Sequence, residues 1–267
     1  MFLNFKENLI RENLSQNTID NYIFSCNQFI EKYKTINKKN LLSYKGFLLE
    51  NYKPKTINLR ILGINRYLDF IGKSELRLKD VKIQQKTFLE NVISNADYEY
   101  FKECLLNDKN YMWYFVIRCL AATGARVSEL IQFKVEHIKV GYIDLYTKGG
   151  KIRRIYIANK LKEDCFNWLN GINKYSGFIF CNKNNIRITT RGIAHQLKAL
   201  AKRYGINESV VYPHSFRHLF AKNFLEKYND IALLADLLGH DSIETTRIYL
   251  RKTSEEQQSI VNNIIVW

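Results

Sequence analysis

The first 80 residues carry apolar side chains at the spacing of one helix face. From residue 19 these positions recur every three or four residues, and Ser15 upstream is a suitable N-cap. They are Ile19, Tyr22, Ile23, Cys26, Phe29, Ile30 and Tyr33. Further helices are predicted over 40–50 and 56–71, with a break at Pro54 between them. No strand pattern is visible here, so the sequence predicts an all-helical N-terminal domain over residues 1–80.

The pattern changes in the second part of the chain. Periodicity is lost after residue 77, and we expect a linker over residues 81–90. Helices are then predicted over 96–106, 111–122, 127–133, 161–169, 190–204, 215–227, 231–238 and 255–265. Residues 135–157 alternate, and the turn Lys148-Gly-Gly-Lys151 between two alternating runs predicts a hairpin. The expected fold class is therefore mainly α with a small β-sheet, with an α+β second domain over residues 91–267.

Composition narrows the class of protein. The chain has 267 residues, of which 46% are hydrophobic and 25% charged, so it is neither disordered nor fibrous. Five cysteines without a CxxC pair indicate a reduced, cytoplasmic protein without a structural zinc site. The longest apolar run, residues 111–122, contains Arg118 and is too short to span a bilayer, so we expect no membrane association.

Charge points to a polyanionic partner. Lys and Arg number 41 against 26 acidic residues, which gives a net charge of +15. Between residues 32 and 66 the only acidic residue is Glu50, among nine basic ones. A solvated helical face is the ordinary explanation of such a run, but this ratio favours a phosphate-binding surface. The nine are Lys32, Lys34, Lys38, Lys39, Lys45, Lys53, Lys55, Arg60 and Arg66.

Four short stretches combine polar residues with apolar surroundings. They are residues 123–130, 147–154, 214–218 and 237–249. Each has an ordinary structural explanation when taken alone. Arg126 can pair with Glu129 on a helix surface, Lys148 can stand in water, and His240 can close a helix. Residues 230–250 also fit a helix-turn-helix motif.

Taken together, two arginines, two histidines, a lysine and a tyrosine suit the cleavage of a phosphodiester. Arginine forks bind non-bridging oxygens and stabilise charge on a pentacoordinate phosphorus. A tyrosine oxygen, with a free pKa of about 10, needs a cationic or basic neighbour to act as nucleophile. A lysine can protonate the leaving 5′-oxygen. Because the arginines supply the charge that a metal would otherwise supply, we expect no metal ion and no cofactor.

The order and spacing of these stretches resemble the tyrosine recombinase (phage integrase) family. That family has an Arg in a TG-x-R-x-SE-L turn, a hairpin Lys, an H-x-x-R-H block, and LLGH followed nine residues later by Tyr. The matching positions here are Arg126, Lys148, His214, Arg217, His240 and Tyr249, with Glu129 as the supporting acidic residue. Ala125 and Phe216 are departures that alter packing, and Thr147 stands where Gly is frequent. Lys151 is the alternative general acid.

The resemblance also covers the N-terminal part, where residues 14–18 with Tyr22 and Phe29 look like the family's core-binding domain. It implies a C-shaped clamp on double-stranded DNA with inverted-repeat half-sites, with Lys151 and Arg153 adding to the DNA-binding surface. Tyr249 would form a covalent 3′-phosphotyrosine, and the freed 5′-hydroxyl would lead to a Holliday junction. The implied roles are DNA integration, excision or chromosome dimer resolution.

The implied assembly is a homo-tetramer, or a hetero-tetramer with a related recombinase, with accessory proteins as further partners. The last predicted helix carries Ile260, Val261, Ile264 and Ile265 on one face, followed by Trp267. This face can pack on its own domain or dock into a neighbouring protomer. Two other functions fit the same residues: a type IB topoisomerase-like nicking-closing enzyme, and a DNA-binding regulator without catalysis.

Overall fold

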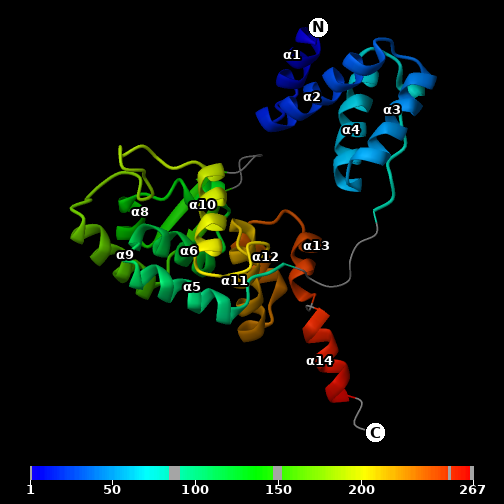
Figure 1. The fold of residues 1–267 in the computed structure, drawn as a ribbon. Helices are drawn as coiled ribbons and strands as arrows, with labels where there is room; N and C mark the ends of the chain where they lie inside the picture. Colours follow the sequence, from blue (N-terminus) through cyan, green and yellow to red (C-terminus); the bar gives the residue numbers. More distant parts are fainter. Residues whose placement is uncertain (1, 84–90, 147–151, 252–253, 265–267) are drawn as a thin grey trace. The chain divides into compact units, whose positions relative to one another are not determined.

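The computed structural model describes residues 2–83, 91–146, 152–251 and 254–264 (Figure 1). The chain divides into two compact units, residues 1–85 and 86–267. The described parts contain no helix that is both long and apolar enough to cross a membrane.

The first unit is entirely helical in the residues described. Its elements are α1 (Leu3–Arg11), α2 (Gln16–Tyr33), α3 (Lys38–Asn51), α4 (Pro54–Phe70) and a 3₁₀ turn, η1 (Ser74–Leu76). The apolar faces enclose one core, in which Phe5, Phe29 and Tyr44 are fully buried. The predicted N-cap is confirmed, because the Ser15 hydroxyl accepts a hydrogen bond from the Thr18 amide.

This unit differs from the sequence prediction at three helices, of which α3 begins at Lys38, two residues before the predicted start. Helix α1 was not predicted, although its Phe5 and Leu9 are buried at helical spacing. Helix α4 begins at Pro54, two residues earlier than expected, because proline is tolerated in the first turn, where the amide needs no partner.

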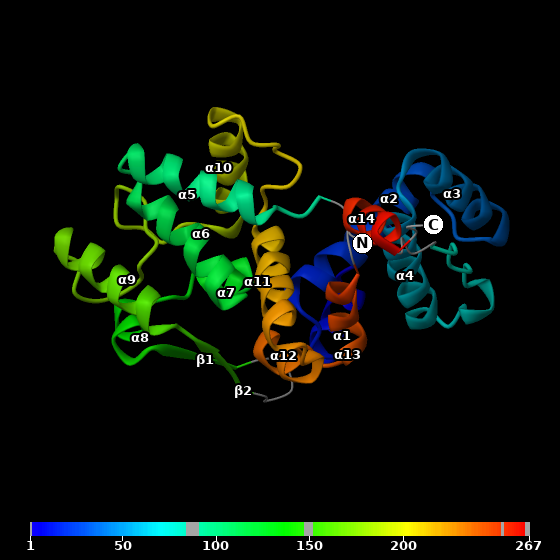
Figure 2. The same cartoon turned by 90° about the horizontal axis from the view of Figure 1, so that it is seen from below.

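The second unit is built around helices α6 and α11 (Figure 2). Its elements are α5 (Asn95–Asn107), α6 (Tyr111–Thr123), α7 (Val127–Leu130), α8 (Val135–Val140), β1 (Tyr142–Tyr146), β2 (Ile152–Tyr156), α9 (Asn159–Gly171), α10 (Thr190–Arg203), α11 (Pro213–Tyr228), α12 (Ile231–Leu238), α13 (Ile243–Thr246), the 3₁₀ turn η2 (Arg247–Leu250) and α14 (Ser254–Ile264). Phe115, Val116 and Ile117 of α6 and Phe216 of α11 lie in its core. The predicted fold class, mainly helical with a small sheet, is confirmed.

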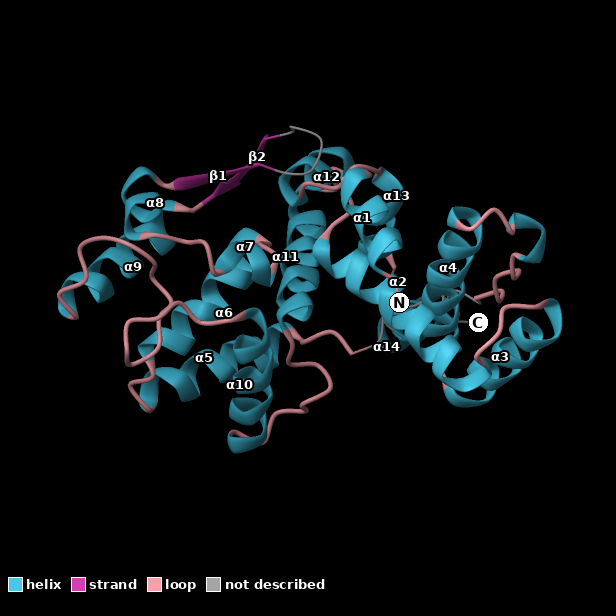
Figure 3. Cartoon of the chain, turned by 90° about the horizontal axis from the view of Figure 1, so that it is seen from above, coloured by secondary structure: helices cyan, strands magenta, loops and turns pink. Residues whose placement is uncertain are grey.

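The sheet consists of the antiparallel pair β1 and β2, drawn in magenta in Figure 3. Ile143 lies opposite Ile155 on the buried face, and Leu145 lies opposite Arg153 on that same face. The alternation predicted from residue 135 is wrong for residues 135–140. They form α8 instead, because Val135 and Ile138 are buried three residues apart.

Gly124, at the end of α6, allows three segments of the second unit to pack closely. Its φ is +62°, and a Cβ atom there would lie 2.6 Å from Phe220 Cδ1 and 2.8 Å from Leu238 Cδ2. Glycine thus lets the turn after α6 approach both α11 and α12. The turn leads to Arg126, α11 carries His214 and Arg217, and His240 follows the end of α12.

Candidate active site

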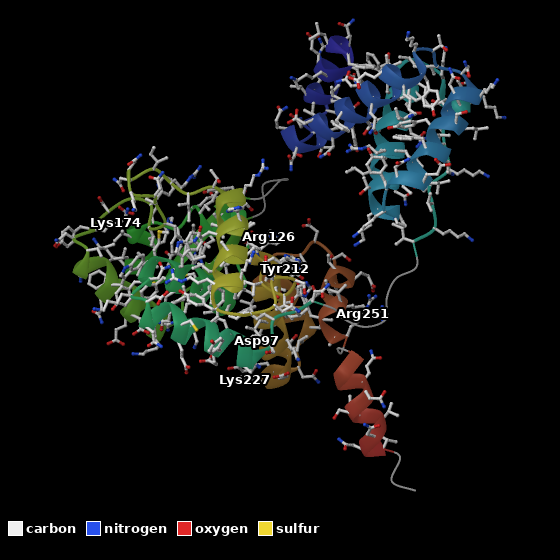
Figure 4. The ribbon with its side chains drawn as sticks, in the orientation of Figure 1. Asp97, Arg126, Lys174, Tyr212, Lys227 and Arg251 are labelled. Atoms are coloured by element: carbon white, nitrogen blue, oxygen red, sulfur yellow. The ribbon has the colours of Figure 1, made fainter. Side chains whose placement is uncertain are left out.

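Arg126 lies at the start of α7, immediately after the Gly124 turn (labelled in Figure 4). Its amide donates to Glu129 Oε2 at 2.6 Å, and its Nη1 donates to Glu129 Oε1 at 2.9 Å. Its Nη2 donates to the Gly239 carbonyl at 3.1 Å. Burial opposes ionisation of Glu129, but the neighbouring Arg153 and Arg126 outweigh it and hold the pKa of this carboxyl below its ordinary value.

Arg217 is 1% exposed and projects from α11 into the same region. Its Nη1 donates to the Gly124 carbonyl at 2.6 Å, and its Nη2 donates to the Leu238 carbonyl at 2.7 Å. Its Nε is buried without a hydrogen-bond partner. Burial, reinforced by the nearby Arg126, lowers the pKa of Arg217 to about 10, so this guanidinium stays charged at neutral pH.

His240 is held from both sides of its ring. Nε2 lies 2.8 Å from Arg217 Nη2, and Nδ1 lies 2.7 Å from Thr246 Oγ1. Since a guanidinium can only donate, Nε2 accepts and Nδ1 carries the proton that is donated to Thr246. Burial, with Arg217 as the next cause, lowers the pKa of His240 to about 4, so the ring is neutral at pH 7.

Tyr249, in η2, is 5% exposed and packs among histidine rings. His240 stacks on it, with ring centroids 6.0 Å apart and an interplanar angle of 9°. His218 meets it edge-on at 4.9 Å, and His214 meets His218 at 4.9 Å. The Tyr249 side chain also interacts with Arg217, where it opposes the lowering of that group's pKa.

His214 and His218 are both neutral at pH 7. Burial lowers the pKa of His218 to about 4, and His214 and Arg217 add to the effect. Desolvation also lowers the pKa of His214, together with the charges of Arg217 and Arg126. The structure therefore brings together five of the six predicted catalytic residues. The sixth, Lys148, lies outside the described residues, as does Lys151.

The prediction that Arg153 contacts DNA is contradicted by its position. Its side chain is buried, and its guanidinium is bonded to Glu129 and to the Leu237 carbonyl. The strand alternation contained the signal, because Arg153 shares the inward parity of Ile155 and Ile157.

Most of the nine basic residues predicted as a phosphate-binding surface between residues 32 and 66 are exposed. Six are exposed: Lys32, Lys34, Lys38, Lys39, Lys53 and Lys55. Lys45, Arg60 and Arg66 are partly buried, and Arg66 is paired with Glu12. The described residues contain no cluster of three or more His, Cys, Asp or Glu side chains that could hold a metal ion.

Comparison with known proteins is decisive for the family. The model of the phage integrase family matches residues 75–256, which is more than half of the chain. The chain belongs to the phage integrase family of tyrosine recombinases. Similar proteins include tyrosine recombinase XerA of Pyrococcus furiosus, 30% identical over 95% of this chain and 92% of the relative. Another is tyrosine recombinase XerD of Oceanobacillus iheyensis, 26% identical over 91% and 90%.

Solved structures show the same fold. An XerH site-specific recombinase bound to its difH substrate gives a TM-score of 0.72 at 21% identity, covering 93% of this chain and 80% of that one. A lambda integrase dimer bound to a COC′ core site gives 0.72 at 15% identity, covering 92% of each. The predicted family and enzyme class, a site-specific tyrosine recombinase, are confirmed. The topoisomerase-like and non-catalytic alternatives are not favoured by these relatives.

Three residues of this tyrosine recombinase site were not singled out for it by the sequence. His218 follows His214 by four residues on one helix, and that spacing was a usable signal for a shared face. Arg153 has the inward parity of its strand and belongs to the buried side of the site. Thr246 is fully buried, and its bond to His240 depends on the turn between α12 and α13.

Proposed function

We propose that this recombinase binds double-stranded DNA at inverted-repeat half-sites and exchanges strands through a covalent 3′-phosphotyrosine and a Holliday junction. The observation that carries the proposal is the placement of Tyr249. Its ring is packed between His218 and His240 and interacts with Arg217, which is itself bonded to His240. A nucleophile, a buried cation and neutral imidazoles are thus gathered in one cluster, in which Arg217 and His240 are hydrogen-bonded and the histidine rings pack on Tyr249.

The arginines provide the phosphate site. Buried donors are costly when unpaired, so the free Nε of Arg217 is a natural partner for a non-bridging phosphate oxygen. Arg126 is partly exposed and keeps its fork orientation through Glu129. Both charges are fixed before DNA arrives, so they stabilise the pentacoordinate phosphorus without reorganisation.

Tyr249 is the proposed nucleophile. Its oxygen attacks the phosphorus, the P–O5′ bond breaks, and the 5′-oxygen leaves as a hydroxyl. We assign acceptance of the phenol proton to His214, which is neutral at pH 7, and protonation of the leaving oxygen to Lys148. The two arginines and His240 stabilise the transition state. A 5′-hydroxyl from a partner duplex then reverses the step, and the bond energy is conserved in the protein–DNA link, so no ATP is required.

The first unit is the proposed core-binding domain, and the second is the proposed catalytic domain. Lys38 and Lys39 occupy the first turn of α3, Lys53 and Lys55 flank the start of α4, and neither first turn contains an acidic residue. Cations at a helix N-terminus oppose the helix dipole by roughly 0.3–1 kcal/mol each. An arrangement that is unfavourable in the free protein becomes favourable when DNA phosphates bind there.

Arg60 provides a second indication of a DNA-binding surface. Its guanidinium lies 4.1 Å from the Phe24 ring centroid, while Nε and Nη1 are buried without hydrogen-bond partners. Phe24 itself is 50% exposed, so an aromatic ring and a cation lie together near the surface. Such a pair suits the sugar–phosphate backbone, whose contacts position a protein on the duplex.

We also propose that α14 links four protomers on DNA. Its Ile260, Val261 and Ile264 are exposed in the described chain, with Ile264 at 65%. An apolar face of this kind is stabilised by docking into a neighbouring protomer. Deleting residues 255–267 should abolish cooperative assembly on a two-half-site duplex while one protomer still binds one half-site. Unchanged cooperativity would refute docking between protomers.

The experiment that tests the proposed function is covalent trapping on DNA. Wild type and Tyr249→Phe are incubated with sheared genomic DNA of the source, quenched with SDS, and the protein-linked ends are sequenced. Capture by wild type alone, at a few discrete sites, supports recombination and places it in a chromosomal or mobile-element setting. Capture without sequence preference would favour the nicking-closing alternative. Specific binding without capture would favour a non-catalytic regulator.

A further inference from the structure

Three consecutive carbonyl groups end helix α12, and each accepts a hydrogen bond from a different arginine. The Leu237 carbonyl accepts from Arg153, at 3.2 Å from Nε and 3.0 Å from Nη2. The next two accept from Arg217 and Arg126. The last carbonyls of a helix lack intrahelical partners and carry partial negative charge, so cations are stabilising there. The turn that carries His240 is thus fixed by three guanidinium groups.

Arg153 has no proposed contact with the phosphate, unlike the other two arginines. Its side chain is 4% exposed. Its Nη1 donates to Glu129 Oε1, the same oxygen that accepts from Arg126 Nη1. Arg153 therefore connects two segments, since one end of its fork holds the carboxylate that orients Arg126 and the other holds the turn before His240. The hairpin strand β2, from which Arg153 projects, lies beside α12 in Figures 2 and 3.

Gly239 supplies an independent observation. Its φ is +62°, and a Cβ atom there would lie 2.2 Å from Arg153 Cδ and 2.8 Å from Arg153 Nε. Arg153 is held by hydrogen bonds at both ends of its guanidinium. Its side chain therefore cannot adopt another rotamer to make room for a Cβ atom at residue 239 without losing those bonds. The glycine before His240 therefore both ends α12 and leaves the space that the Arg153 side chain fills.

We propose that Arg153 is a positioning residue for strand cleavage, which holds Arg126 through Glu129 and His240 through the C-terminal turn of α12. The inference rests on the proposed function, because it concerns that same site. It assigns to Arg153 no contact with DNA. A shift of about 1 Å in a catalytic group can lower a rate by about 100-fold, so a residue of this kind strongly affects chemistry while leaving DNA binding intact.

The test compares Arg153→Met and Arg153→Lys with Arg154→Met as the matched control. Arg154 is the next residue on the same strand, but it points outward and pairs with Asp144 on the surface. Three quantities are measured: single-turnover cleavage of a target-site duplex, its Kd as a function of salt, and hydrogen exchange in peptides covering residues 237–241. That turn is read directly, because the Gly239 and His240 amides donate to Asp236 and Ala235.

For Arg153→Met we expect cleavage to fall by about 10- to 100-fold, with Kd and its salt slope unchanged and exchange in the turn accelerated. Arg153→Lys should be intermediate, because a single ammonium cannot span both acceptors. Arg154→Met should match wild type in all three. The double variant Arg153→Met/Glu129→Gln should lose less cleavage rate than the product of the two single losses, because both changes release Arg126.

A lower salt slope for Arg153→Met would overturn the proposal, since that result identifies a DNA contact. Wild-type rates of cleavage and of hydrogen exchange in Arg153→Lys would also overturn the proposal. The lysine variant keeps a positive charge beside Glu129, so it remains a usable test if Arg153→Met does not fold. Should wild type itself form no covalent adduct, the proposed function fails. Hydrogen exchange still decides the role of Arg153 in that case, because unchanged exchange in both variants would refute the connection.

Discussion

Thr246 offers a direct test of the hydrogen-bond network at His240. The hydroxyl of Thr246 is the acceptor for His240 Nδ1, at 2.7 Å, and it is fully buried. Thr246→Val replaces this hydroxyl by a methyl group of similar size, so packing is nearly preserved. The Nδ1 proton then has no acceptor. The other tautomer, with the proton on Nε2, is also unfavourable, because that N–H would face the Arg217 Nη2 donor at 2.8 Å.

The expected cost of Thr246→Val follows from the two unfavourable tautomers that remain to His240. A buried donor without a partner costs about 1–3 kcal/mol, and His240 is only partly buried, so we expect about 1–2 kcal/mol. If that penalty falls on the transition state, cleavage slows by roughly 5- to 30-fold. Thr246→Ser keeps the hydroxyl and should retain most of the rate.

Single-turnover cleavage provides the assay, together with ¹⁵N chemical shifts of the His240 ring, which distinguish its two tautomers. The account predicts an Nδ1-protonated ring in wild type and Thr246→Ser, and a changed tautomer population in Thr246→Val. Equal cleavage rates for the valine and serine variants would refute the reasoning. An Nε2-protonated ring in the wild type would refute it as well.

Three further predictions concern stability and DNA binding. Gly124→Ala should lower the free energy of unfolding by at least about 1 kcal/mol, because φ is +62° and the added Cβ would overlap side chains of α11 and α12. Gly171→Ala is the control, since open space surrounds the added Cβ there, and it should leave the free energy of unfolding unchanged. Thermal melts compare the two variants. His218 has a folded pKa of about 4, below its unfolded value near 6.5, so it contributes stability above about pH 6.5 that is lost as pH falls toward 4. His218→Gln should therefore show a shallower loss of stability in acid, measured by denaturant titration across that range. Changing Lys38 and Lys39 to Gln should reduce the slope of log Kd against log salt by about 0.9 for each DNA phosphate that these lysines neutralise, and an unchanged slope would exclude both from the DNA surface.

The helical pattern predicted the fold where apolar residues mark a long face. The helix from residue 16 and its Ser15 cap follow from local chemistry alone. Helix α8 did not, because six residues that contain Val135 and Ile138 fit an alternating pattern almost as well as a helical one. Short elements take their structure from the core on which they pack, and that core is formed by residues distant in the sequence.

In the candidate site, too, the residues can be predicted from local sequence, whereas their contacts depend on tertiary structure. Arg126, Arg217, His240 and Tyr249 stand in motifs with fixed spacing, so the sequence alone predicts them as site residues. Their interactions come from tertiary contacts: Arg217 bonds carbonyls at residues 124 and 238, which lie in separate segments. The burial of Arg153 does not follow from the sequence, because a basic residue beside a glycine turn is ordinarily exposed. Here Glu129 and a helix end provide partners for the buried charge.

The central claim is that Tyr249 becomes covalently joined to DNA, and mass spectrometry of the trapped complex tests it most directly. Wild type is incubated with a nicked target duplex, so that the released 5′-hydroxyl strand diffuses away, and the adduct is digested with trypsin and nuclease. The account predicts that the peptide containing Tyr249 carries a nucleotide 3′-phosphate on its phenolic oxygen and that the released strand has a free 5′-hydroxyl. An adduct on another residue, a link through a 5′-phosphate, or an adduct that persists in Tyr249→Phe would contradict it.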